Sequence, residues 1–167
     1  MKIKYLILII SLVSFSIMLS AQETINHCGF EIYKMSFGLY LKDTNQKKYT
    51  QIPKDKVGAP LADLVSSEIV TASKIREIEK SIFTKDEIDQ FAAKGRNYAI
   101  CRIHSSGRIV AVSFELKVDE LNDAQVKKFV SLRNRLIEEV SFNFQFIREV
   151  GEDGYIGQSL PIIVNRD

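Results

Sequence analysis

The chain has 167 residues, with 23 basic and 21 acidic side chains and a formal net charge of +2. This length suits one ordinary domain with a real hydrophobic core. Lys2 and Lys4 account for the basic excess, so the remaining residues are balanced in charge. A neutral domain lacks the field that attracts nucleic acid or an anionic membrane, and we expect neither as a partner.

The first 21 residues have the pattern of a secretory leader. Two lysines precede an apolar run over residues 5–19, and Ser20 and Ala21 are the small residues that signal peptidase requires. The run is shorter than the roughly 20 apolar residues of a spanning helix, although an uncleaved anchor is the alternative. We therefore expect a signal peptide over 1–21 and one secreted or periplasmic domain over 22–167 that does not span a membrane.

The first half of this domain has mixed periodicity. Alternating apolar and polar residues predict one strand over 30–41, with residues 49–52 pairing back onto it. Apolar spacing predicts a short helical turn within 61–65 and a longer amphipathic helix over 75–83. Thr84 and Glu87 have the spacing of a capping box, which predicts a further helix that ends at Gly95.

The second half gives clearer signals. Strands are predicted over 98–104 and 108–117, with Gly107 supplying the positive φ of the turn between them. Asn122 and Gln125 predict the start of an amphipathic helix that reaches residue 140. Strands over 142–146 and 160–164 follow, and Pro161 indicates an edge position for the last one.

This order of elements predicts an α+β fold. We expect a small antiparallel sheet with helices packed on one face, in the sequence helix, hairpin, helix, strand, with residues 84–165 as the best-defined part.

The motifs YAICRIHSSGRIVAVSFEL, FNFQF and GYIGQSLPIIV resemble the C-terminal domain of TonB and its secreted relatives. Gly107 matches the hairpin glycine, Gly157 the glycine before the last strand, and residues 160–162 the terminal motif. The resemblance implies a TonB-like fold over about 84–165. Small uncharacterised secreted proteins of Gram-negative bacteria are also similar. The chain has three prolines and no proline-rich spacer, so the resemblance does not extend to the energy-transducing role of TonB.

Cys28 and Cys101 are the two cysteines of the chain. In an oxidising compartment an even cysteine count favours a disulfide, which would close a long loop and stabilise the fold by about 4 kcal/mol. Two buried free thiols are the alternative.

Metal-binding and catalytic patterns are weak. His27 lies next to Cys28 and His104 lies three residues after Cys101, but residues three apart on a strand point to opposite faces, which argues against a zinc site. The chain lacks a phosphate-binding glycine loop, a nucleophile elbow and a zinc-protease helix motif. We expect no catalytic residues, no metal and no cofactor.

The function expected from these features is that of a non-enzymatic binding or accessory module in the cell envelope. A partner protein or peptide would add a strand to an exposed sheet edge, and a second copy of the chain could do the same. A small metal-binding or hydrolytic envelope protein is the alternative. The residues expected at the edge are Phe142, Phe144, Phe146, Leu160, Ile162 and Val164.

Overall fold

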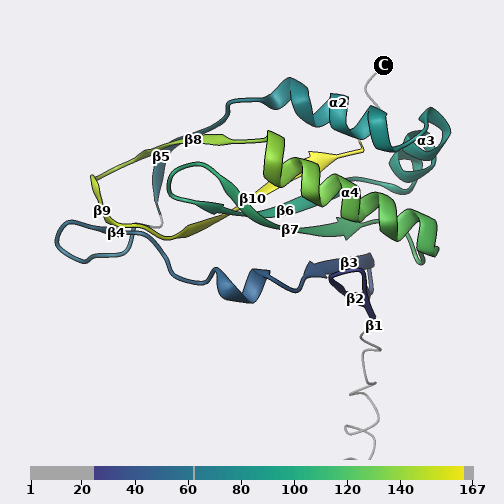
Figure 1. Cartoon of the computed structure of the whole chain (residues 1–167), viewed down its shortest axis with the longest axis horizontal. Helices are drawn as coiled ribbons and strands as arrows, with labels where there is room; N and C mark the ends of the chain where they lie inside the picture. The colour runs from purple at the N-terminus through teal and green to yellow at the C-terminus, as the bar shows by residue number, and fades with distance from the viewer. Residues whose placement is uncertain (1–24, 62, 164–167) are drawn as a thin grey trace, which may run out of the picture.

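The structure, a computed structural model, describes residues 25–61 and 63–163 (Figure 1). The expected leader over 1–21 and Val164 lie outside the described residues. Within them the chain has a mixed α+β fold, built from antiparallel strands and helices.

A six-stranded antiparallel sheet forms the centre of the described residues. Its strands lie in the order β1-β2-β3-β7-β6-β10. The bounds are β1 (Ile25–His27), β2 (Phe30–Met35), β3 (Gly38–Asp43), β6 (Asn97–His104), β7 (Ile109–Leu116) and β10 (Tyr155–Ile162). Two short ribbons flank it, β4 (Lys54–Asp55) with β9 (Val150–Glu152), and β5 (Leu64–Ile69) with β8 (Phe142–Phe146); η1 (Gln46–Lys48) is a 3-10 turn.

The helices are α2 (Ala72–Ile82), α3 (Lys85–Lys94) and α4 (Asp123–Glu139). Both predicted capping boxes are present, because Thr84 and Glu87 exchange hydrogen bonds at the start of α3, as do Asn122 and Gln125 at the start of α4. Such caps each stabilise a helix by about 1 kcal/mol. Helix α4 packs on β7 and α2 packs beside α4, so the helices lie on one side of the sheet (Figure 1).

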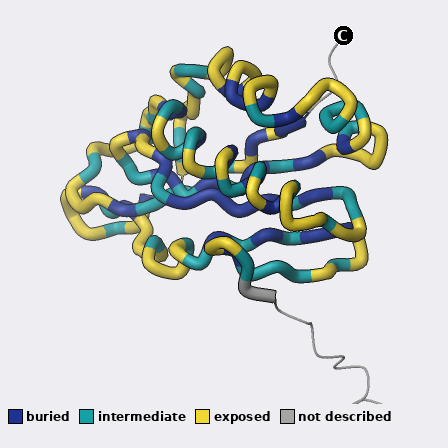
Figure 2. The backbone as a smooth tube through the Cα atoms, turned by 45° about the vertical axis from the view of Figure 1, so that its right-hand side comes forward, coloured by how far each residue is buried: buried dark blue, intermediate teal, exposed yellow. Residues whose placement is uncertain are grey.

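The face of the sheet under the helices carries the core. One row of paired residues crosses five strands there, and Phe129 of α4 packs on it with its ring centroid 5.1 Å from that of Phe114. Burying each large apolar side chain contributes about 1.5–3 kcal/mol. Figure 2 shows that burial is greatest along the central strands. The row consists of Ile32, Leu41, Phe114, Ala99 and Leu160.

The single strand predicted over 30–41 is wrong. The chain reverses at residues 36–37, so β2 and β3 form a hairpin in which Met35 pairs with Gly38. Gly38 has φ 134°, and a Cβ there would lie 2.1 Å from the Leu116 carbonyl oxygen. The position therefore requires glycine. Residues 49–52 form no strand, because β3 already supplies the partner of β2.

Two other predicted boundaries differ from the structure. The expected helical turn within 61–65 is wrong, since β5 begins at Leu64 and pairs with β8. The last strand begins at Tyr155 rather than at residue 160, and it pairs with β6 over its whole length. In both places long-range pairing overrides the local pattern.

Candidate functional site

The outer edge of β10 is the open edge nearest the helices. In an antiparallel pair, the N–H and C=O groups of alternate residues point toward and away from the partner strand. Ser105 N–H donates to the Gly154 carbonyl at 2.9 Å, which directs the even-numbered residues of β10 toward β6. Gly157, Ser159 and Pro161 therefore direct their backbone groups outward, and all three are exposed.

Both ends of this edge are closed by contacts from other parts of the chain. Tyr155 N–H donates to the Gln51 carbonyl at 2.7 Å, and Ile163 N–H donates to the Glu79 carboxylate at 2.8 Å. No strand of the described chain pairs with the edge between these points. Because proline has no N–H, the outward donors in this window are Gly157 and Ser159.

A cavity of about 200 Å³ lies beside this edge. It separates the end of β10 from α2, so an added strand would have β10 on one side and a helix on the other. The walls are mainly apolar, with one arginine and one glutamate among them. The lining residues are Ile69, Ala72, Ile75, Arg76, Glu79, Leu160 and Pro161.

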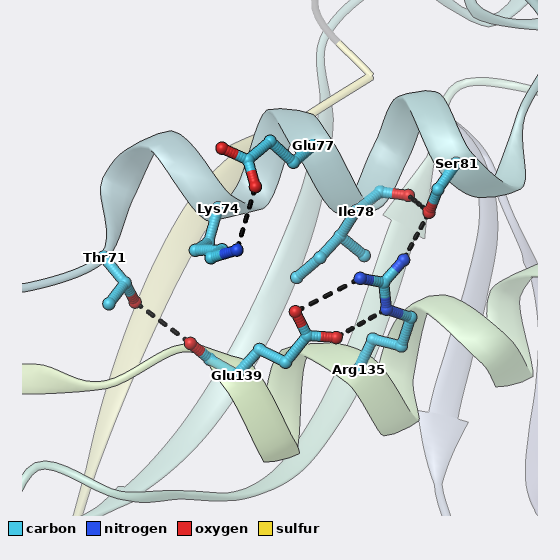
Figure 3. Close-up of polar contacts among 7 residues, drawn as sticks. All are labelled: Thr71, Lys74, Glu77, Ile78, Ser81, Arg135 and Glu139. Carbon is cyan, nitrogen blue, oxygen red and sulfur yellow. Dashed lines mark hydrogen bonds and ion pairs between the residues drawn. The ribbon is translucent and has the colours of Figure 1, made fainter.

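Polar contacts hold α2 in place against α4 (Figure 3). Arg135 donates to both carboxylate oxygens of Glu139, at 2.6 and 3.1 Å, and also to the Ser81 hydroxyl on α2. Thr71 donates to the Glu139 carbonyl at 3.2 Å. The hydrogen bonds from Arg135 hold the pKa of Glu139 below its usual value. The helix that forms one wall of the cavity is thus fixed at both of its ends.

The other predicted edge, β8, is already occupied on one side by β5. Phe142 N–H donates to the Gly107 carbonyl at 2.8 Å, which uses part of the other side. The rings of Phe142 and Phe144 stack with centroids 5.7 Å apart, and those of Phe144 and Phe146 contact edge-on at 6.0 Å. Phe142 is buried and Phe144 packs against the core, so these side chains serve packing.

Two of the residues predicted at the edge, Leu160 and Ile162, lie on β10, but their side chains point inward. Leu160 and Ile162 are buried, and their backbone groups pair with β6. Gly157 and Ser159, which carry the outward groups, were not among the residues predicted at the edge. Pro161 was the available signal. Proline on an edge strand occupies a position whose N–H would point away from the sheet, so the residues two and four before it, Ser159 and Gly157, also direct their backbone groups outward.

The expected disulfide between Cys28 and Cys101 is absent, and both are free thiols. Cys28 lies in the turn before β2 and Cys101 on β6, with β3 and β7 between those strands. Three strand spacings amount to about 14 Å, whereas a disulfide joins Cα atoms up to about 7 Å apart. Burial raises the pKa of the Cys101 thiol to about 12, so this side chain acts as a small core residue.

The histidines lie in two separate places. Nε2 of His27 is 3.5 Å from a carboxylate oxygen of Asp123 at the start of α4. His104 lies at the β6–β7 turn, on the opposite face from Cys101. Within 25–61 and 63–163, no three His, Cys, Asp or Glu side chains lie close enough together to hold a metal ion.

Serine, histidine and aspartate do meet at the β6–β7 turn, in a cluster that no sequence motif indicates. Nδ1 of His104 is 2.9 Å from the Ser106 hydroxyl, and Ser105 donates to Asp153. However, Nδ1 also accepts the Ser106 N–H at 3.2 Å, and Nε2 is 4.0 Å from the Asp153 carboxylate. A hydrolytic triad needs a hydrogen bond between histidine and acid, so these contacts serve to brace the turn.

Comparisons with known proteins give the fold. No family model matches the sequence, and no curated protein matches it. Among solved structures, the chain is similar to a DUF5043 family protein from Bacteroides uniformis, with a TM-score of 0.57 and 16% identity over 87% of this chain and 93% of that one. The two proteins share an α+β fold. Among the described helices, none has the length and apolar character needed to cross a membrane.

Proposed function

We propose that the protein is a non-enzymatic binding module of the cell envelope that accepts an extended segment of a partner protein or peptide on the outer edge of β10. The observation that carries the proposal is that Gly157 and Ser159 are exposed residues whose backbone groups are directed away from β6. Main-chain hydrogen bonds to such an edge give affinity in strand-addition complexes.

The composition of β10 supports this proposal. Proteins usually protect an open edge with lysine, other charges or inward-pointing polar groups. No charged residue lies between Tyr155 and Ile163, and the proline at 161 interrupts the outward groups only at the end. Apart from Pro161 at one end, the edge therefore lacks the features that prevent strand addition.

The cavity between α2 and β10 supplies the second element of recognition. Side chains of an added strand alternate, so every second one would point toward α2. Ala72 and Ile75 of α2, with Ile69 of β5 beside them, make that wall apolar, and Arg76 and Glu79 supply its polar groups. A partner segment with an aliphatic residue at this position fits the cavity best.

The proposal also includes a location in the cell envelope and a resemblance of the fold to the C-terminal domain of TonB. The leader pattern over 1–21 supports a secreted or periplasmic site of action. A TonB-like arrangement is supported by the chain order of α3, the β6–β7 hairpin, α4 and β10.

A titration with a capped heptapeptide of alternating valine and threonine, followed by NMR, tests the proposal. We expect shifts at Gly157 and Ser159 and along α2. Ser159→Pro removes the outward N–H without touching the β6 ladder, and should weaken binding about tenfold or more, whereas the matched control Ser159→Ala should bind like the wild type. Equal binding by both variants, or no shift in β10, would contradict the proposal.

A second copy of the chain is the other occupant that this edge allows. Two copies could pair their β10 strands in antiparallel fashion, with a two-fold axis at Gln158. Gly157 of each copy would then pair with Ser159 of the other, and both residues have outward donors and acceptors. Light scattering distinguishes this case: a dimer that Ser159→Pro converts to a monomer would identify the chain itself as the partner.

A further inference from the structure

The tyrosines of the described chain gather on the face of the sheet opposite the helices. Four lie on strands with that orientation, and the fifth, Tyr49, contacts the ring of Tyr155 with centroids 5.0 Å apart. The core under the helices is instead rich in phenylalanine. A tyrosine ring can pack against apolar groups while its hydroxyl stays in water, so this segregation suits an accessible face. The strand tyrosines are Tyr33, Tyr40, Tyr98 and Tyr155.

Three of these tyrosines lie in one row across the sheet. Tyr33 pairs with Tyr40, Tyr40 and Tyr98 both pair with Glu115, and Tyr98 pairs with Pro161. Directly paired residues point to the same face. The row therefore reads Tyr33, Tyr40, Glu115, Tyr98 and Pro161 from β2 to β10, and all of its side chains are at least partly accessible.

The row has a recess at one end. A cavity of about 310 Å³ lies among Tyr33, Met35, Tyr40, Lys42 and Gln46. Gln46 of η1 is held there by a hydrogen bond of 2.8 Å from the Ser113 hydroxyl. The turn η1 thus forms a wall along one side of the row.

The charges beside the row are paired with one another. Lys42 lies 3.4 Å from Glu31, and Lys117 lies 3.1 Å from Glu115. Tyr33 also donates to Glu31 at 2.8 Å. Both acids beside the row are thus paired with lysines, so the row presents aromatic rings and hydroxyls without an unpaired carboxylate, and a ligand needs no positive charge to bind there.

The spacing of the rings indicates the kind of ligand. Tyr40 and Tyr98 stand two strands apart, which is about 9.6 Å. A polyproline II helix advances about 9.3 Å in each three-residue turn. We infer that this row binds an uncharged proline-rich segment in the polyproline II conformation, with prolines of successive turns seated on Tyr40 and Tyr98.

The chemistry of such a segment matches the row. A polyproline II backbone has no internal hydrogen bonds, so its carbonyl groups are free to accept from tyrosine hydroxyls. Proline rings pack on aromatic faces, and the preformed helix loses little entropy on binding. The row meets β10 only at Pro161, whereas the outward N–H donors of the edge lie at Gly157 and Ser159, so the two sites can be tested independently.

The experiment is an NMR titration of the folded chain with capped decaproline. We expect shifts in β3, β7 and β6, and a loss of affinity of about tenfold or more in Tyr40→Ala and Tyr98→Ala. Tyr155→Ala is the matched control, because Tyr155 lies on the same face outside the row, and it should bind like the wild type. Tyr40→Phe and Tyr98→Phe keep the ring, so they should fold normally and lose affinity only through the missing hydroxyl.

A parallel titration with an uncharged oligosaccharide, cellohexaose, defines the outcomes that overturn the inference. Shifts at the row with cellohexaose and none with decaproline would make the face a glycan site. If neither probe shifted the NMR signals of the row, the tyrosines would serve only to pack across the strands, and the inference would be wrong. Equal loss of decaproline affinity in Tyr155→Ala would also contradict the assigned site.

Discussion

The buried carboxylate of Glu79 on α2 accepts a hydrogen bond at 2.8 Å from the backbone N–H of Ile163, across 84 residues of sequence. This contact ends the outward ladder of β10 on one side, as the Gln51 carbonyl does on the other. It also ties Ile163, the residue directly after β10, to the helix that borders the cavity. Glu79 therefore sets both the length of the open edge and the position of its wall.

Removal of this acceptor should destabilise the fold. Glu79→Ala leaves the Ile163 N–H buried without a partner, which costs about 1–3 kcal/mol in the free energy of unfolding. Glu79→Gln keeps an oxygen acceptor and should cost less. Urea unfolding measures both, with the exposed Glu77→Ala as a control that changes stability little. A loss in Glu77→Ala as large as in Glu79→Ala would contradict the role of the Ile163 contact.

The ion pair between α3 and α4 should make stability depend on pH. Lys128 Nζ lies 2.5 Å from both carboxylate oxygens of Glu87, and these hydrogen bonds hold the pKa of Glu87 below its usual 4.5. Because the folded-state pKa is lower than the unfolded one, the stabilisation is complete above about pH 5 and is lost as the pH falls through the folded value.

Glu87→Gln keeps an acceptor for the Thr84 N–H and removes only the charge. We expect this substitution to lower the free energy of unfolding by about 0.5–1 kcal/mol at pH 7 and to leave it unchanged at pH 2.5. Urea unfolding at both pH values measures the difference. Glu120→Gln, at an exposed position, is the control and should be neutral throughout. If Glu87→Gln lowered the free energy of unfolding as much at pH 2.5 as at pH 7, the ion pair could not be the cause of the loss.

The two thiols should react very differently in the native protein. Cys28 is exposed, whereas Cys101 is buried and has a pKa of about 12. Iodoacetamide at pH 8 should therefore label one thiol per folded chain and two after denaturation, which intact mass reports. A disulfide would instead give no labelling and a mass lower by two hydrogens. That result would contradict the strand order that separates the two cysteines.

The second half of the fold could be predicted from local patterns, because its signals are short-range. The capping residues Thr84 and Asn122 begin helices where expected, and Gly107 has φ 89° in the expected turn. Each of these depends on contacts within about four residues. Pro161 likewise indicated an edge, which β10 is.

The features missed from the sequence depend on long-range pairing. The turn at 36–37 changes the face of the odd-numbered residues, so Tyr33 lies on the open face and Leu39 in the core, although both belong to one alternating run. Strand order likewise separates Cys28 from Cys101. The tyrosine row is formed by four different strand pairings, and no local pattern indicates it.

Hydrogen exchange of the backbone amides of β10 tests the open edge most directly. In the free, monomeric protein we expect Gly157 and Ser159 to exchange at least ~100-fold faster than Gln158 and Leu160, whose N–H groups bond to β6. Uniform protection from residue 156 to 160 would mean that the edge is already covered, and would contradict strand addition at β10.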